Sequence, residues 1–464
     1  MSKNYEINFT QGKLFPALWS FAIPVILSGI LQLLYNAADI IVVGRFAGEE
    51  SLAAVGSTSS MINLLVNLFM GLALGANVLI SRGYGSGNDK LLHRAVHTTI
   101  LVAFCGGILF GTIGFIFSRP ILEWMGSPDD VIEKSTLYVK IYFAGLPALS
   151  LFNFGNAILR AVGDTRRPLF ALMISGIINV ILNLILVIVF HMDVAGVAIA
   201  TVTSEIFSAI YVLLCLIRTD RPYRLILKKL RIYKAELSQL LQVGLPSGVQ
   251  SSLFSLSNVL IQSTINSFGT LAIAGSAAAG NIEGFVYTAM NSMQTTVLTA
   301  SAQNLSVKNF DRIRKGMYSC LLLVCLIGIP LSALTILFAK PLVSIYTDDL
   351  GAIDYGIRRL YWVCLPYCIC GMMDVLSGVL RGLAHSLLPM VVSLLGSCVF
   401  RIFWIFCILD FNRTWEMLFL AYPISWTITS IAHYISIRIL LPRLERRLSP
   451  EDKKTKTIES VEQK

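Results

Sequence analysis

The sequence predicts an all-α integral membrane protein with twelve transmembrane helices in two six-helix bundles. Two observations predict this class: long apolar segments alternate with short charged connections, and an internal repeat divides the chain into similar halves. Of the 464 residues, 55% are hydrophobic and 14% are charged, and the mean hydropathy is +0.71. A soluble domain could not bury this much apolar surface, so we expect a lipid bilayer to cover it.

Each apolar segment is long enough to cross a membrane as a helix. The hydrocarbon core is about 30 Å thick and needs about 20 residues, and every backbone group within it must be hydrogen-bonded inside the protein. The first apolar run has no cleavage-site signature, so we expect it to stay in the chain. The predicted spans lie near residues 14–40, 50–80, 95–117, 135–158, 167–190, 195–217, 237–265, 274–302, 316–339, 355–380, 387–409 and 415–440.

The charges of the connections predict the orientation in the membrane. Alternate connections are basic, and the positive-inside rule places them in the cytoplasm together with both chain termini. The other connections are short or acidic, as at Glu49–Glu50, Asp129–Asp130 and Asp348–Asp349, although Arg358 and Arg359 weaken the pattern. The same rule accounts for the net charge of +10, so the basic charge does not indicate a nucleic-acid partner, and we expect none. We expect a multi-pass protein of the plasma (inner) membrane.

A repeat at a nearly constant offset divides the chain into two copies. Pro24 matches Pro246 at an offset of 222, and Gly56 matches Gly275 at an offset of 219. Because each copy contains an even number of spans, both copies enter the membrane in the same orientation, and a pseudo-twofold axis along the membrane normal is expected. An offset of 221 recurs between Pro120 and Pro341, Arg160 and Arg381, and Pro168 and Pro389.

The repeat and the charge pattern together predict the domain organisation. We expect an N-terminal six-helix lobe at residues 1–218, a basic cytoplasmic linker at 219–235, a C-terminal six-helix lobe at 236–441 and a polar cytoplasmic tail at 442–464. A cleft between paired bundles is the natural transport route for such a chain. We expect the protein to act as a monomer within the lipid bilayer.

Several short motifs occur in order along the chain: Asn36-Ala-Ala-Asp39 with Val43-Gly44, Leu52-Ala-Ala-Val-Gly56, Ser81-Arg-Gly-Tyr-Gly-Ser-Gly-Asn88, Leu159-Arg-Ala-Val-Gly-Asp-Thr165 and Ala302-Gln303-Asn304. Together they resemble the multidrug and toxic compound extrusion (MATE) family, closest to its bacterial DNA-damage-inducible-protein-like branch. The resemblance covers about residues 10–440. It implies outward- and inward-facing forms and export of small organic, often cationic, compounds driven by a proton or sodium gradient.

Asp39 is the main candidate for ion coupling. It lies within the first apolar run, flanked by Ile40-Ile-Val-Val43. A charge at a helix centre costs about 2.5–3.5 kcal/mol on insertion scales, so an acid in a membrane helix is a functional candidate by default. Protonation would remove its hold on a cation, which makes a coupling switch, and the family carries an acid on its first helix. The alternative is a position near the outer water boundary.

Further polar residues of the first half could complete the coupling site. Asn179 and Asn183 are four residues apart, so their side chains share one helix face. In the resemblance, Asn179 and Thr201 match cation-site positions, whereas Asn183 stands where many relatives have a second Asp, which favours protons over sodium. Asn156 is a further coupling candidate and Glu205 a weaker one. Each asparagine could instead form only an interhelical hydrogen bond.

The second half offers fewer acids at the matching positions. Its seventh span has no acid, and Asp374 lies about one turn from the position that sodium-coupled relatives use, so we expect coupling in the first half. Glu283 and Asp374 could instead form interhelical pairs, for example with Arg401. The candidates for contact with substrate are Tyr35, Asn36, Gln262, Glu283 and Asp374.

Enzyme and metal motifs are not supported by the sequence. Gly83-Tyr-Gly85-Ser-Gly87 resembles a phosphate-binding loop, but it follows a membrane helix rather than a strand, and Lys90 lacks the required spacing. His93 and His97 share a helix face without a nearby carboxylate of that helix, so no metal site is expected. The nine cysteines are scattered and are interpreted as small apolar residues. We expect no enzyme activity and no cofactor.

Two alternative functions stay open at this point. A lipid-linked saccharide flippase of the same superfamily would favour a larger basic cleft and additional helices. A membrane receptor or scaffold without transport would leave the duplicated lobes and Asp39 without an evident role. The favoured hypothesis is therefore a cation-coupled exporter, with a proton or sodium ion as the coupling ion.

Overall fold

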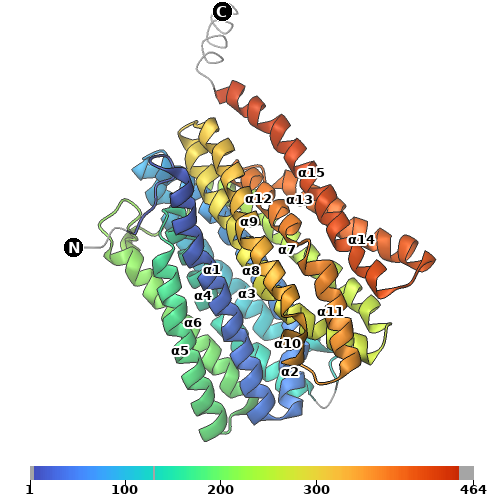
Figure 1. Cartoon of the computed structure of the whole chain (residues 1–464). Helices are drawn as coiled ribbons and strands as arrows, with labels where there is room; N and C mark the ends of the chain where they lie inside the picture. Colours follow the sequence, from blue (N-terminus) through green and yellow to red (C-terminus); the bar gives the residue numbers. More distant parts are fainter. Residues whose placement is uncertain (1–4, 129–130, 449–464) are drawn as a thin grey trace, which may run out of the picture. The chain divides into compact units, whose positions relative to one another are not determined.

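The computed structural model describes residues 5–128 and 131–448, and this part of the chain contains helices and no strand (Figure 1). The predicted Asp129–Asp130 pair, and the predicted tail from residue 449 onward, lie outside the described residues. The long helices are α1 (Leu14–Val42), α2 (Glu49–Gly85), α3 (Asp89–Trp124), α4 (Ile132–Ala161), α5 (Arg166–Asn183), α6 (Asp193–Arg218), α7 (Lys234–Asn266), α8 (Thr270–Ser306), α9 (Phe310–Leu337), α11 (Leu350–Cys364), α12 (Tyr367–Gly382) and α15 (Trp415–Leu448).

Shorter helical pieces complete these elements. A π-helical turn follows α1 and another follows α5, and the predicted eleventh span is a continuous run of short α-helical and π-helical pieces. These pieces are η1 (Val43–Ala47), η2 (Leu184–Val189), η3 (Leu227–Lys229), α10 (Ala339–Ser344), α13 (Leu387–Ser393), η4 (Leu394–Val399), α14 (Phe400–Phe403), η5 (Trp404–Ile408) and η6 (Leu409–Phe411).

The lengths of the helices suit a bilayer. Nine helices of the described residues are long and apolar enough to cross a membrane, or ten when α11 and α12 count as one span. Helices α7 and α8 are less apolar, but their 33 and 37 residues exceed the length needed to cross about 30 Å. The polar side chains of α8 include Gln303 and Asn304, which are buried in the protein rather than turned to lipid.

One predicted span is not a single helix. The sequence pattern predicts a membrane span near residues 355–380, and the structure forms it from α11 and α12, which meet at a bend of 44°. Pro366 lies at this junction, and a proline lacks the backbone donor that would continue the helix. The predicted span is therefore present and is bent at Pro366.

The chain divides into two compact units. Unit 1 contains Met1–Ile7 and Ser20–Leu256, and unit 2 contains Asn8–Trp19 and Ser257–Lys464. The long helices α1 and α7 thus each contribute residues to both units. The lobe boundaries near residues 218 and 236 stay predictions.

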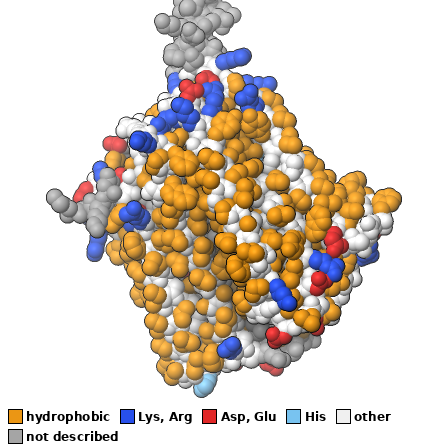
Figure 2. Space-filling view, viewed as in Figure 1, with side chains coloured by type: hydrophobic (Ala, Val, Ile, Leu, Met, Phe, Trp, Pro, Cys, Tyr) orange, Lys and Arg blue, Asp and Glu red, His pale blue; other side chains and the backbone are white. Residues whose placement is uncertain are grey.

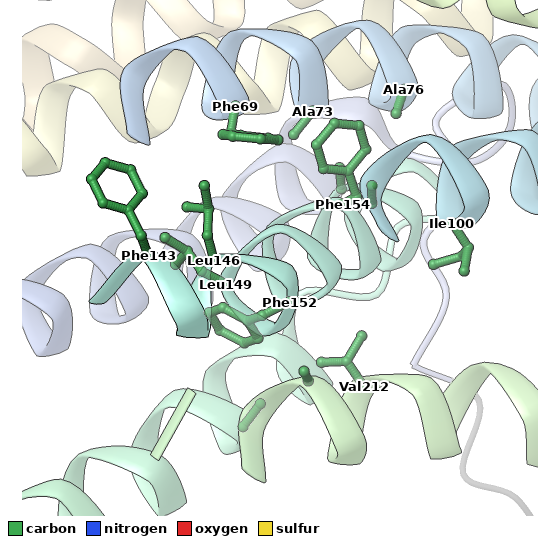
Figure 3. Close-up of a cluster of buried hydrophobic side chains, with 14 of the residues drawn as sticks. Phe69, Ala73, Ala76, Ile100, Phe143, Leu146, Leu149, Phe152, Phe154 and Val212 are labelled. Carbon is green, nitrogen blue, oxygen red and sulfur yellow. The ribbon is translucent and has the colours of Figure 1, made fainter. Parts of the chain in front are cut away.

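Unit 1 has a core of large apolar side chains around α4. Phe143, Leu146 and Phe154 are buried among side chains from α2, α3 and α6 (Figure 3). Helices α3 and α4 approach closely at Gly107, where an added Cβ would lie 2.6 Å from Cα of Pro147. Small residues at such crossings let two membrane helices pack backbone to backbone.

The outer surfaces of the helices are apolar. Figure 2 shows hydrophobic side chains along the helices, and basic side chains near the end of α15. Ile116 and Phe117 of α3, for example, are 63% and 51% exposed. Exposed apolar surface of this extent is typical of protein covered by lipid.

The N-terminal segment, residues 5–12, binds to unit 1 through Glu6. The Glu6 carboxylate accepts hydrogen bonds from Tyr223 (2.9 Å) and Tyr84 (3.2 Å), and Arg221 lies 3.2 Å away as an ion pair. Burial raises the pKa of Tyr223 to about 12, and the nearby carboxylate acts in the same direction. Gly163 has a φ of +86°, and any Cβ there would overlap the Ile7 backbone.

The second part of the N-terminal segment binds to unit 2. Phe9 is fully buried, and its backbone N–H donates to Gln303 (2.9 Å). The Arg312 guanidinium donates to the carbonyl oxygens of Phe9 (2.8 and 3.0 Å), Gln11 and Gly12 (both 3.0 Å). Two of the motif residues that resemble the MATE family, Gln303 and Asn304, therefore bind this segment.

Candidate functional site

The polar cluster around Asp39 combines side chains from α1, α5 and α6, all in unit 1. Nδ2 of Asn183 donates to Oδ1 of Asp39 at 2.5 Å, and Oγ1 of Thr201 donates to Oδ2 at 3.2 Å. Asn179 lies one helical turn before Asn183, and its Oδ1 accepts from Nδ2 of Asn183 at 3.0 Å. Four of the five predicted coupling residues thus form one hydrogen-bonded group, which we call the Asp39 cluster.

Local helix geometry aims these side chains at one another. The four-residue spacing of Asn179 and Asn183 places both on one face of α5, and α5 passes into the π-helical turn η2 directly after Asn183. Such wide turns are frequent at functional sites. Thr201 lies on the adjacent helix α6, where its hydroxyl also reaches the Val197 carbonyl at 3.0 Å. Because a hydroxyl has a single hydrogen, it can donate to Val197 or to Asp39, but not to both.

The cluster has spare oxygen acceptors. Oδ1 of Asn183 is buried and has no hydrogen-bond partner among the described residues. The Asp39 carboxylate and the Thr201 hydroxyl are further oxygens of the cluster, and oxygens are the ligands that hard cations prefer. An unsatisfied buried acceptor costs free energy, so its presence suits a site that binds something in another state.

A second layer of hydroxyl groups supports the Asp39 cluster. The Tyr35 hydroxyl and Oγ of Ser204 are 2.6 Å apart, and Ser204 donates to the Thr201 carbonyl at 2.8 Å. Glu205, the next residue of α6, is half-buried. Among the described residues, neither Asp39 nor Glu205 forms an ion pair with a basic side chain. The centre of unit 1 is therefore acidic.

Asn156, Asn36 and Gln262 belong neither to the Asp39 cluster nor to the layer of hydroxyl groups that supports it. Asn156 is buried on α4, and no hydrogen bond joins it to the cluster among the described residues. Asn36 is exposed on α1. Gln262 is exposed on α7, where it donates to Asn266 at 3.0 Å. Their predicted roles in coupling or in contact with substrate stay predictions.

The buried acids of unit 2 have partners of their own. Glu283 of α8 accepts two hydrogen bonds from Arg359 of α11, at 2.7 and 2.8 Å. Interhelical pairing was the alternative foreseen for Glu283, but the suggested partner Arg401 was wrong. Asp374 of α12 accepts from Asn291 at 3.1 Å and does not pair with Arg401 either.

Sequence reasoning missed Arg359 as a partner because it assigned this arginine to a connection. The signal was present in the pattern: Arg359 belongs to α11, where Gly356, Leu360 and Val363 form a buried face. An arginine next to such a face must bring a partner or line a polar space.

The histidine pair is structural. Nδ1 of His97 lies 2.7 Å from the His93 carbonyl, and Nε2 accepts from the Ile226 backbone N–H at 3.1 Å. Both ring nitrogens of His97 are therefore engaged by backbone. Within residues 5–128 and 131–448, no group of three His, Cys, Asp or Glu side chains is arranged to hold a metal ion.

Comparison with known families decides the class of this protein. The MatE family model matches residues 24–185 and again residues 246–407, so both halves of the chain match the same model. The chain belongs to the MATE family. The two matches begin at Pro24 and Pro246, which the sequence repeat also pairs, so the repeat is the family's own duplication. Members of the family are transporters rather than enzymes.

Curated relatives and solved structures agree with this assignment. The chain is 28% identical over 405 residues to the probable multidrug resistance protein YoeA of Bacillus subtilis, covering 85% of this chain and 88% of YoeA. It is 24% identical to an FAD transporter of Shewanella oneidensis, covering 79% and 82%. An outward-facing MATE transporter structure superimposes with a TM-score of 0.90 at 20% identity, covering 96% and 100%. The predicted all-α, twelve-helix fold is confirmed.

This MATE protein is therefore a multi-pass membrane transporter of a multidrug efflux family. Transporters of the family bind small organic substrates within the membrane and need no cofactor. The assignment to the DNA-damage-inducible-protein-like branch stays a prediction.

Proposed function

We propose that this MATE protein exports small organic compounds, mainly cations, in exchange for protons, with Asp39 as the coupling group. The observation that carries this proposal is the environment of Asp39: one carboxylate on α1 is held by the neutral side chains of Asn183 and Thr201, without a basic partner among the described residues. Such a carboxylate can bind either a proton or a cationic substrate. Competition between the two couples export to proton entry.

A proton fits this cluster better than sodium does. Hard cations bind best to several oxygen ligands that together carry enough negative charge. Here one carboxylate supplies the only full charge of the group, and Asn183 presents its amide nitrogen to Asp39 rather than its oxygen. Proton binding needs one acceptor only, which Asp39 provides.

The driving force is sufficient for useful export. A membrane potential of 100 mV is worth about 2.3 kcal/mol per charge moved, and this free energy supports a concentration ratio of roughly fifty. Export needs alternation between outward- and inward-facing forms, for which we propose the six-helix lobes at residues 1–218 and 236–441. We place both termini in the cytoplasm and the protein, as a monomer, in the plasma membrane.

The test is transport in proteoliposomes with an imposed pH or sodium gradient and a fluorescent cation such as ethidium. We expect the wild type to accumulate ethidium with a pH gradient, and Asp39→Asn, which has no carboxylate for either a proton or a cation, to accumulate none. Asp410→Asn, which removes an exposed acid, is the matched control and should behave as the wild type. Normal accumulation by Asp39→Asn would remove Asp39 from the mechanism. Wild-type transport without any gradient dependence would refute the antiport proposal.

The name of one relative indicates a substrate that is not a cation. The relative from Shewanella oneidensis is named an FAD transporter, and FAD carries a negatively charged diphosphate. A substrate with a negative group would need a positive side chain in the transporter. The acidic Asp39 cluster does not supply one, but unit 2 contains a buried arginine.

A further inference from the structure

Arg401 of α14 is buried in unit 2 without a carboxylate partner among the described residues. Only 5% of this residue is exposed. Its Nε donates to Oγ of Ser425 on α15 at 3.0 Å, and no described residue accepts from its two terminal nitrogens. A guanidinium has five N–H donors, so most of its donors stay available.

Aromatic rings surround this guanidinium. Its central carbon lies 4.2 Å from the ring centre of Tyr422 and 5.9 Å from that of Trp426. Tyr367 of α12 stacks on Trp426 with ring centres 5.3 Å apart. We call Arg401, Ser425, Tyr422, Trp426 and Tyr367 the Arg401 cluster. Ring faces stabilise the positive charge, and they offer flat apolar surface to a ligand.

Three other buried charges of unit 2 have partners. Arg359 pairs with Glu283, Asp374 is bound by Asn291, and Arg381 interacts electrostatically with Asp374. Arg401 is thus a positive charge inside a membrane helix with no negative side chain to balance it within the described chain. A charged residue in such a position marks a pathway or binding site by default, because burial without function is costly.

The backbone around Arg401 supports a binding role. The π-helical turns η4 and η5 flank the single helical turn α14 that carries it. Turns of this kind are rare in proteins and are frequent at functional sites. They displace side chains from the ordinary helical position, here on both sides of Arg401.

The internal repeat gives the Arg401 cluster a counterpart in unit 1. Ser425 matches Ser204 and Tyr422 matches Thr201, both at the same offset that separates the repeated prolines Pro120 and Pro341. The sixth span of each copy thus contributes to a polar cluster, α6 in one copy and α15 in the other. In the first copy an acid of α1 lies beside this span, and in the second copy an arginine of α14 lies beside it on aromatic rings.

We propose that the Arg401 cluster is a binding site for organic anions, in which the terminal nitrogens of Arg401 bind a carboxylate or another oxyanion and the aromatic rings hold an attached ring system. This proposal rests on the proposed function, because it names a second substrate class for the same exporter. Arginine suits the task, since its planar fork binds a carboxylate through two parallel hydrogen bonds.

The test measures binding of fluorescein, an aromatic anion, to the full-length protein in phosphatidylcholine nanodiscs by fluorescence anisotropy. We expect saturable binding to the wild type and a loss of at least about tenfold in affinity for Arg401→Gln, as for a lost charge-assisted hydrogen bond. Arg401→Lys keeps the charge without the fork and should give an intermediate affinity. The matched control Arg413→Gln changes an exposed arginine that donates to Ser267, and it should leave the affinity within about twofold.

A second measurement uses only the wild type, in case Arg401→Gln does not fold. Benzoate should displace fluorescein, whereas benzamide, which has the same ring without the charge, should not. Equal displacement by both compounds, an unchanged affinity of Arg401→Gln, or absence of saturable fluorescein binding would each overturn the proposal.

Ethidium transport separates this inference from the proposed function. Gradient-driven ethidium export without fluorescein binding would overturn the anion site alone. Arg401-dependent fluorescein binding without gradient-driven ethidium export would overturn the proposed antiport and support the anion site.

Discussion

Replacing Asn183 by Asp should convert the Asp39 cluster into a sodium site. The amide nitrogen of Asn183 lies 2.5 Å from Oδ1 of Asp39, so the substitution places two carboxylates in direct contact. Thr201, Asn179 and the Val197 carbonyl lie in the same hydrogen-bonded group and would supply further oxygen ligands. The change adds the negative charge that the wild-type cluster lacks.

The expected gain in sodium binding follows from the repulsion between the two neighbouring carboxylates. Two unit charges 4 Å apart repel by about 4 kcal/mol at an effective dielectric constant of about 20. At about 1.4 kcal/mol for each factor of ten, this is nearly a thousandfold penalty on two ionised carboxylates without a cation between them. A bound sodium ion removes this repulsion, so the variant should bind sodium far better than the wild type does.

The assay is ethidium transport in proteoliposomes with a sodium gradient and equal pH on both sides. We expect Asn183→Asp to respond to sodium at least about tenfold more strongly than the wild type, well within the thousandfold limit above. The double variant Asp39→Asn/Asn183→Asp is the matched control, because it moves one carboxylate across the contact without adding a second. The reasoning is refuted if Asn183→Asp shows no sodium response, or if the double variant gains the same response.

Three further results are expected. Gly107→Ala should lower the unfolding free energy of the protein in detergent by about 1–3 kcal/mol, because the new methyl overlaps the α4 backbone. The control Gly106→Ala meets only ordinary van der Waals contacts and should be neutral or stabilising. Equal effects of the two substitutions would contradict the packing argument. Burial raises the pKa of Tyr223 from 10.0 to about 12, so the stability that this shift contributes is complete below pH 10 and is lost as the pH rises through 12. Between about pH 9 and pH 11, thermal unfolding should therefore show a smaller loss of stability in Tyr223→Phe than in the wild type. An equal loss in both proteins would contradict this role of Tyr223. Arg312→Ala removes four hydrogen bonds to the N-terminal segment and should speed hydrogen exchange of the buried amides of that segment at least about tenfold. The control is Arg314→Ala, because Arg314 is half-buried and pairs with Asp311 and Glu445 instead, so exchange in the N-terminal segment should stay unchanged.

The fold was predictable because simple patterns of the sequence determine it. Membrane helices need long apolar runs, and a duplication preserves its prolines at a constant offset, so both features can be read without knowing any contact. The bend at Pro366 could have been anticipated, because a proline inside a helix removes a backbone donor. Helices α7 and α8 are less apolar but were located by the same pass along the chain, and the repeat pairs them with α1 and α2.

The site was predictable only where helix geometry determines the neighbours. The four-residue spacing of Asn179 and Asn183 fixes a shared face, and the rarity of membrane acids points to Asp39. Which helix a buried residue meets depends on tertiary packing, which no local pattern encodes. The partner of Glu283 was therefore misassigned to Arg401, although a partner was correctly anticipated, and the separation of Asn156 from the cluster could not be foreseen.

The two copies of the repeat share their prolines and differ in the polar side chains at their centres. Prolines and close-packed glycines set helix direction and spacing, so a change there would disturb a whole lobe. A polar side chain at the centre of a lobe affects mainly its immediate neighbours, and it can change charge while the surrounding helices stay in place. Thr201 and Tyr422 are such a pair at equivalent positions of the repeat, and they belong to the Asp39 and Arg401 clusters. A duplicated transporter can in this way hold an acidic site for coupling in one copy and acquire a basic site for another substrate class in the other, because each copy carries its own polar centre on a shared scaffold.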